Sequence, residues 1–186
     1  MNKKIPTPKL TAIITIIAAG ALMRFIPHWP NFTPIAAMAL FGGAYLGRKA
    51  LAFVIPLAAM FLSDLIIGFH QDMVAVYIAF TFTVLLGWTL THKKISAGSV
   101  ITRSLAASIL FFLVTNFSAW LSIPMYPKNV AGLLEAYAAG LVFFNNGSLG
   151  ISFFLNEVTG TLFFSGVLFG AYALAKQQIP AIARAN

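Results

Sequence analysis

Four carboxyl groups carry the most reactive chemistry of this chain, and two of them, Asp64 and Glu157, interrupt apolar sequence. An ionisable side chain in an apolar segment is costly unless it faces a protein interior or a water-filled cavity. We therefore predict that both belong to a functional site, with Arg24 as a candidate counter-ion. Two simpler interpretations stay open: Asp64 caps its helix or only pairs with Arg24, and Glu157 stabilises the positive end of a helix dipole.

Neutral polar and aromatic residues extend this set. Asn116 follows the apolar run 109–114, where an amide needs hydrogen-bonding partners from a ligand or a neighbouring helix. His28 and His70 are either ligands of a metal or cofactor or surface residues, and Trp120 belongs either to an interfacial aromatic belt or to a stacking wall. The candidate ligand-binding residues are Arg24, His28, Asn31, Asp64, His70, Tyr77, Asn116, Trp120, Tyr126, Asn156 and Glu157.

Motifs of the common enzyme classes are missing from the sequence. It contains no G-x-S-x-G, H-E-x-x-H, P-loop or G-x-G-x-x-G pattern, and it has no cysteine. The lack of cysteine excludes disulfides, thiolate nucleophiles and cysteine metal ligands. We expect a protein that is not an enzyme, holds no metal or cofactor and does not hydrolyse ATP by itself.

The elements that must position these residues are membrane spans. The chain has 186 residues, 60% of them hydrophobic and only 9% charged, which is too little polar surface for a water-soluble fold. A hydrocarbon core of about 30 Å needs about 20 apolar residues per helix, so the length allows about six spans. The net charge of +8 would favour nucleic acid in a soluble protein, but the basic residues occupy short connections. We therefore expect a lipid bilayer and no nucleic acid as partner.

The apolar runs predict an all-α integral membrane protein forming one transmembrane domain over residues 1–186. Segment 130–144 would reach only about 22 Å as a helix, so we expect a short helix at the outer face there. Both termini are expected in the cytoplasm, since only Arg24 and Lys128 of the 12 basic residues then lie outside. The protein is expected to be multi-pass in a bacterial cytoplasmic (inner) membrane. The six expected spans are 10–27, 33–47, 50–68, 73–91, 99–121 and 149–175.

Small residues at four-residue spacing mark the second expected span. Ala39, Gly43 and Gly47 would lie on one helix face and allow a neighbouring backbone to approach closely. We predict a tight helix crossing on this face.

The stretch RFIPHWPNFTPIAAMALFGGAYLGRKALAFVIPLAAMFLSDLIIGFH, with TNFSAWL and MYPKNVAGLLEAYAAGLVFF, resembles a family of small bacterial membrane proteins known as a domain of unknown function. That family is similar to the substrate-binding S components of energy-coupling factor vitamin transporters, including solitary cobalamin-binding relatives. The resemblance, over residues 24 to 170, implies a six-helix bundle that captures a vitamin-like ligand under outer loops 24–34, 68–73 and 121–149. It also implies an energising module of a transmembrane partner and ATPases. Cysteine-based cobalt ligation is excluded, because the chain has no cysteine.

Three functional hypotheses follow. The leading one is a substrate-binding membrane component for uptake of a small organic nutrient, such as a vitamin. The first alternative is a membrane enzyme acting on a lipid or lipid-linked substrate, with Asp64, His70 and Glu157 as acid-base groups. The second alternative is a non-catalytic assembly protein that binds its partner through the small-residue face around Gly43.

Overall fold

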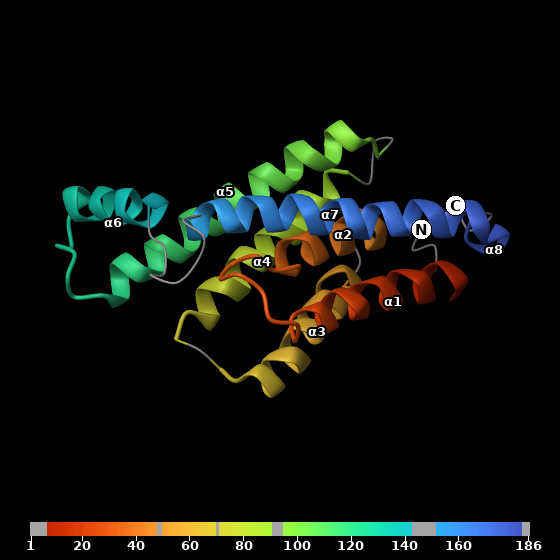
Figure 1. Ribbon diagram of the computed structural model, residues 1–186, viewed down its shortest axis with the longest axis horizontal. Coiled ribbons are helices and arrows are strands. Elements are labelled where there is room, and N and C mark those ends of the chain that lie inside the picture. Colours follow the sequence, from red (N-terminus) through yellow and green to blue (C-terminus); the bar gives the residue numbers. More distant parts are fainter. Residues whose placement is uncertain (1–6, 48–49, 70, 91–94, 143–151, 184–186) are drawn as a thin grey trace.

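The computed structural model describes residues 7–47, 50–69, 71–90, 95–142 and 152–183, and this part of the chain is helical without a strand (Figure 1). Helix α5 and helix α7 are by far the longest, with 26 residues each. The elements in chain order are α1 (Thr7–Met23), α2 (Ile35–Leu46), α3 (Leu51–Ile67), α4 (Met73–Trp88), α5 (Ala97–Ser122), α6 (Val130–Val142), α7 (Phe153–Gln178) and α8 (Pro180–Ala183).

A helix lies in each of the seven segments where the apolar runs predict one. The largest differences are four residues: α7 begins at Phe153 rather than at 149, and α1 ends at Met23 rather than at Pro27. Proline disfavours helical backbone at the residue before it and lacks the N–H that a helix interior needs. Pro27, Pro30 and Pro34 therefore keep the connection to α2 irregular. The short α8, which the sequence did not predict, packs against α1 and α7.

Helix α2 lies at the centre of the bundle. Residues 36–44 are all buried, and the helix contacts α1, α3, α4, α5 and α7. Its closest approach is to α4, where a Cβ on Gly43 would come within 2.1 Å of the Val84 carbonyl oxygen. From the other side, a Cβ on Gly87 would come within 2.4 Å of the Leu40 carbonyl oxygen. This crossing therefore requires glycine on both helices.

The small-residue face of α2 ends at Gly43. Ala39 is fully buried in the same helix, but Gly47 lies after its last residue, with φ 65°, and its N–H donates to the Gly43 carbonyl at 3.1 Å. A positive φ of this kind favours glycine and ends helices. Gly47, predicted as part of the packing face, therefore lies beyond the last residue of α2 and acts as its C-cap residue.

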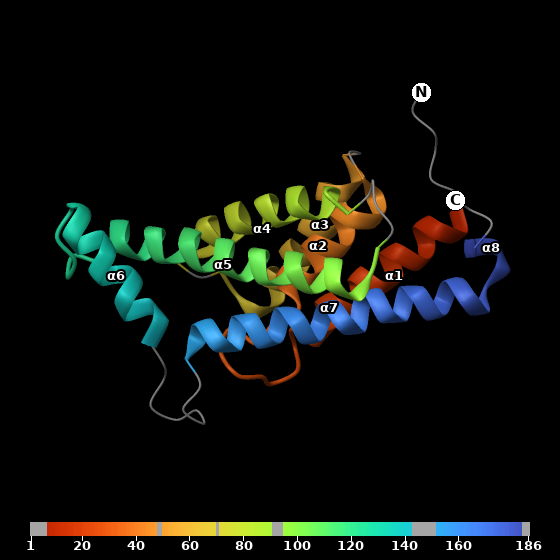
Figure 2. The ribbon, with the colours of Figure 1, turned by 90° about the horizontal axis from the view of Figure 1, so that it is seen from above.

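The bundle has two distinct ends. Figure 2 shows α6 at one end, and the start of α1 together with α8 at the other. The C-terminal half of α5 and the start of α7 reach the end that carries α6, which we call the α6 end. The connection between α1 and α2 lies along the first half of α7, because Asn156 donates to the Pro30 carbonyl and Phe32 contacts Phe163 and Phe164. Segments far apart in sequence thus meet near the α6 end.

Large apolar side chains cover much of the outside of the bundle. Helices α5 and α7 are long and apolar enough to cross a membrane. On α5, apolar residues recur every fourth position with 38% to 55% of each exposed. A surface helix of a water-soluble protein carries polar residues on its outer face. The exposed residues of this α5 face are Ile101, Leu105, Ile109, Leu113, Phe117 and Leu121.

Candidate functional site

A cavity of about 440 Å³ opens at the α6 end between α5, α6 and α7, with the start of α4 and the connection after α1 completing its wall. Its volume is within the range of small-molecule sites in proteins. Four of the residues proposed from sequence line it: Asn31, Asn116, Tyr126 and Glu157. The other lining residues are Asp72, Val76, Phe111, Phe112, Thr115, Ala119, Ile123, Met125, Ala136, Ala139, Gly140, Phe153 and Phe154.

Glu157 is the buried carboxyl group of this cavity. It lies in the second turn of α7 and is only 3% exposed. The hydroxyl of Thr161, one helical turn later, donates to Oε1 at 2.8 Å. Within the described residues Glu157 forms no ion pair. The carboxyl group in this cavity wall therefore has one hydrogen-bond donor and no counter-ion among the described residues.

Asn116 brings α6 against α5. Its side-chain nitrogen donates to the Phe112 carbonyl at 2.9 Å, so part of the amide is satisfied within α5. A Cβ on Gly140 would come within 2.0 Å of Asn116 Oδ1. The absence of a side chain at Gly140 thus lets the amide pack directly on α6.

Aromatic rings form an apolar wall of the cavity. Phe112 of α5 packs edge-on against Phe154 of α7, with 5.0 Å between centroids, and lies 5.8 Å from the ring of Tyr137 of α6. The Tyr137 hydroxyl donates to the Leu113 carbonyl at 3.0 Å, and burial raises the pKa of this hydroxyl above its ordinary value. Sequence reasoning missed these phenylalanines, because nothing distinguishes them from the other phenylalanines of an apolar chain.

The rim of the cavity is polar. Asn31, in the connection between α1 and α2, has a φ of 63°, an uncommon conformation that asparagine tolerates better than most residues. Asp72 precedes α4 as its N-cap residue and is exposed to the cavity mouth. Asp72 was not among the candidate ligand-binding residues, although its position before an apolar helix could have identified it.

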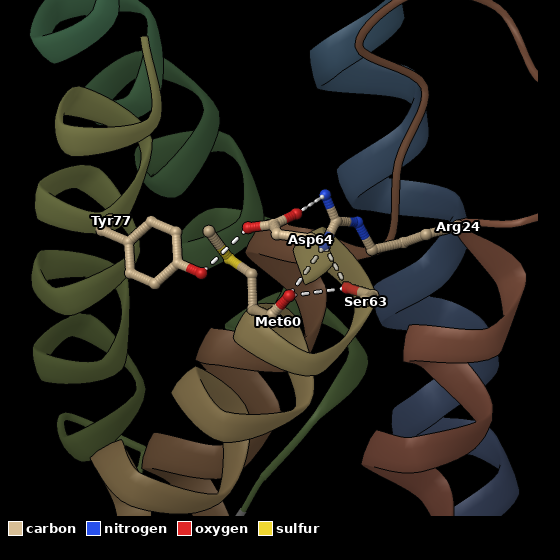
Figure 3. A network of polar contacts seen from close by, with 5 residues as sticks. All are labelled: Arg24, Met60, Ser63, Asp64 and Tyr77. Atoms are coloured by element: carbon tan, nitrogen blue, oxygen red, sulfur yellow. Dashed lines mark hydrogen bonds and ion pairs between the residues drawn. The ribbon is translucent and has the colours of Figure 1, made fainter. Parts of the chain in front are cut away.

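A second polar cluster joins three segments (Figure 3), and none of its residues lines the cavity. Arg24 Nη2 lies 2.6 Å from Asp64 Oδ1, and their side chains are 9% and 1% exposed. Tyr77 of α4 donates its hydroxyl to Asp64 Oδ2 at 2.9 Å. Arg24 Nη1 also donates to the Met60 carbonyl at 3.2 Å and to the Ser63 hydroxyl. The Arg24–Asp64 pairing weighed from sequence is therefore present.

This second cluster ties α3 to α4 and to the end of α1. Neither Asp64 nor Tyr77 lines the cavity, so the structure separates them from Glu157 and Asn116. Helices α3 and α4 touch less than any other pair of helices in contact. The hydrogen bond from Tyr77 to Asp64 is therefore a principal link between them. Both charged groups of this cluster have their partners among the described residues, so their charges are compensated within the fold.

The remaining candidates hold loops or lie on the surface. Asn156 Nδ2 donates to the Pro30 carbonyl at 2.9 Å, and Trp120 Nε1 donates to the Pro127 carbonyl at 2.8 Å. His28 is exposed beside a shallow surface groove, with Nδ1 3.0 Å from the Trp29 carbonyl. His70 lies outside the described residues. Across the ranges described, no three His, Asp or Glu side chains gather as a metal site.

Comparison with known proteins gives a family without an assigned activity. A family model described as "Family of unknown function (DUF6580)" matches residues 4–182. Neither a curated protein nor a solved structure matches the chain.

Proposed function

The chain belongs to the Family of unknown function (DUF6580), and we propose that it is an integral membrane protein that binds a small organic nutrient for uptake. The observation that carries this proposal is the cavity of about 440 Å³ at the α6 end, with its aromatic wall and a few polar groups. Small-molecule sites typically combine these features, since apolar walls bury the ligand and polar groups orient it.

The bilayer is supported by the exposed face of α5. Its six apolar residues run from Ile101 to Leu121, which corresponds to about 30 Å of helix. This length matches the hydrocarbon core of a bilayer. Helix α3 also carries large apolar side chains that are more than half exposed, namely Leu62, Leu65 and Ile66. Lipid is the solvent in which such faces are stable.

Six spans with the α6 end outside agree with the charge distribution. Lys9, Arg103 and Lys176 lie at helix ends opposite α6, as expected for the cytoplasmic side. All four acidic residues lie in elements near the α6 end. We assign α1, α2, α3, α4, α5 and α7 as the spans and α6 as an outer helix, in a bacterial cytoplasmic membrane.

The short α2 fits this arrangement. Its 12 residues reach about 18 Å, less than the hydrocarbon thickness. Irregular backbone at membrane depth is tolerated where protein surrounds it. Asn156 supplies such a partner by donating to the Pro30 carbonyl before α2. Five neighbouring helices shield α2 itself from lipid.

We propose a vitamin-like ligand, captured from outside in the manner of the S components of energy-coupling factor transporters. The resemblance and the outward position of the cavity support this class. The volume favours a vitamin smaller than cobalamin. The described part of the chain supplies the binding site and the helices that support it. We therefore propose that inward release uses an energising partner module. We expect the protein not to be an enzyme, because two of the candidate acid-base groups do not share a site: Glu157 lines the cavity and Asp64 does not.

Native mass spectrometry of the protein extracted gently from its own membrane tests this function. We expect a bound small organic molecule in the wild type and its loss in Ala139→Phe, where a ring fills the cavity. The matched control is Ala138→Phe on the same helix, an exposed position outside the cavity lining, which should keep the ligand. A wild type that carries only phospholipid would contradict nutrient binding and favour a lipid site.

A further inference from the structure

We propose that the cavity selects an organic cation, with the positive nitrogen of the ligand beside Glu157 and an apolar or aromatic body against the phenylalanine wall. The inference rests on the proposed function, because it names the ligand class of the same site. It covers protonated amines and permanently charged nitrogen groups.

The lining residues of charged type are all acidic. Among its described lining residues, Asp72 and Glu157 are acidic, and there is no lysine, arginine or histidine. Two basic residues close in sequence to lining segments have partners within the chain. Arg24 pairs with Asp64, and Lys128 donates to the carbonyl of Ile123 at 2.9 Å and to that of Trp120. Neither of them lines the cavity.

Helix ends compensate this charge only in part. The N-terminus of α7 is capped by Ser152, whose side chain accepts from the Leu155 N–H at 3.2 Å. The N-terminus of α4 begins after Asp72, near that carboxyl group. Each helix N-terminus carries roughly half a positive charge, so two of them leave two carboxylates incompletely balanced. At the C-terminus of α5, Lys128 donates to the carbonyl of Trp120 and to that of the C-cap residue Ile123.

Glu157 gives the cavity its specificity for a cation. The side chain is 3% exposed and receives one hydrogen bond, from Thr161. Buried carboxylates are unfavourable unless a counter-charge accompanies them. A ligand cation supplies that charge at a position where the described part of the chain supplies none. A neutral or anionic ligand of the same shape leaves Glu157 without a counter-charge.

The aromatic wall suits the same ligand. Phe112 and Phe154 both line the cavity, and their centroids lie 5.0 Å apart. Aromatic faces attract cations through the ring quadrupole and stack on planar apolar groups. Ring and carboxyl group therefore favour one ligand class, an amphipathic cation.

Three probes of equal length but different charge test the inference: 4-phenylbutylammonium, 4-phenylbutanol and 4-phenylbutyrate. Their binding to the full chain is measured by equilibrium dialysis in zwitterionic phosphatidylcholine nanodiscs, with empty nanodiscs as the measure of lipid partition. We expect the ammonium probe to bind at least about tenfold more tightly than the alcohol, as for a charge-assisted hydrogen bond. The carboxylate should bind most weakly.

The variant Glu157→Gln should lose about tenfold in affinity for the ammonium probe and little for the alcohol. Its matched control is Glu135→Gln on α6, because Glu135 is exposed and does not line the cavity. The preference of the wild type among the three probes needs no variant, so a folding defect in Glu157→Gln does not weaken the test. Equal or tighter binding of the alcohol or the carboxylate overturns the inference.

Different results would contradict the nutrient-binding function and the selection of a cation. A neutral or anionic molecule that co-purifies with the wild type and is lost in Ala139→Phe would keep the proposed function and overturn cation selection. Absence of both a co-purifying molecule and probe binding would overturn both. An ammonium preference that Glu157→Gln abolishes supports both.

Discussion

Arg24 and Asp64 form a buried ion pair, with 2.6 Å between Nη2 and Oδ1, although one lies beyond the end of α1 and the other in the last turn of α3. Tyr77 completes the arrangement from α4. This pair fixes the α6 end of three helices around charges that would be costly alone in an apolar environment.

Breaking this pair from one side should destabilise the protein strongly. Asp64→Asn leaves the Arg24 guanidinium buried without a counter-charge, for which a loss of about 3–5 kcal/mol is typical. Thermal unfolding in nanodiscs measures the effect, with Asp72→Asn at an exposed position as the control. Unchanged stability of Asp64→Asn would show that the pair contributes nothing.

Removing the Tyr77 hydroxyl should have a smaller effect. Tyr77→Phe keeps the ring and deletes one hydrogen bond to a charged group, which typically contributes about 1.5–3 kcal/mol. The same unfolding assay should rank this variant between the wild type and Asp64→Asn. Tyr126→Phe, which removes a hydroxyl of the cavity rim instead, is the matched control. A Tyr77→Phe variant as stable as Tyr126→Phe would contradict the link.

A methyl group at Gly43 should disrupt the centre of the bundle. The added Cβ would lie 2.1 Å from the Val84 carbonyl oxygen, so α2 and α4 must separate. Overpacking of this kind typically costs about 1–3 kcal/mol or more. Gly166→Ala on α7 is the control, because a Cβ there meets nothing within 4 Å. Since alanine favours helix over glycine, that control should be neutral or stabilising.

In the assembly hypothesis, the small-residue face around Gly43 binds a partner protein. Gly43 is covered by Val84 and Gly87 of the same chain. Gly43→Ala should therefore lower stability rather than release a partner protein. Loss of a partner from a variant of unchanged stability would contradict this expectation.

The cysteine-free sequence makes the proposed topology directly measurable. Single cysteines at Ile109 and Leu113 on the exposed α5 face should resist a water-soluble maleimide in intact membranes, because lipid covers them. Met125→Cys, near the α6 end and 72% exposed, should react from outside. Gln177→Cys, exposed at the end of α7, should react only after permeabilisation. Rapid labelling of the α5 positions would contradict the bilayer assignment.

The helices could be predicted from sequence because their causes are local. Apolar run lengths and prolines mark the seven segments to within a few residues, as with α3 and α6. The end of α2 at Gly47 could not be predicted in this way. Its four-residue spacing fits a packing face, but the helix ends before it, and only the backbone conformation reveals that.

The candidate residues could be named from sequence but not grouped. Asp64 and Glu157 look alike along the chain, as polar groups in apolar runs. The fold gives Asp64 a counter-ion from the connection after α1 and places Glu157 in a cavity whose described lining residues include no counter-ion. It also adds Phe112 and Phe154, which carried no polar signal.

The sequence by itself determined that this chain is helical, strongly apolar and polarised in charge, since composition and local periodicity depend only on neighbouring residues. Tertiary structure decided which buried carboxyl group has a counter-ion among the described residues and where the cavity opens. Those properties depend on distances between α1, α3, α4, α5 and α7, which packing sets and no local pattern encodes.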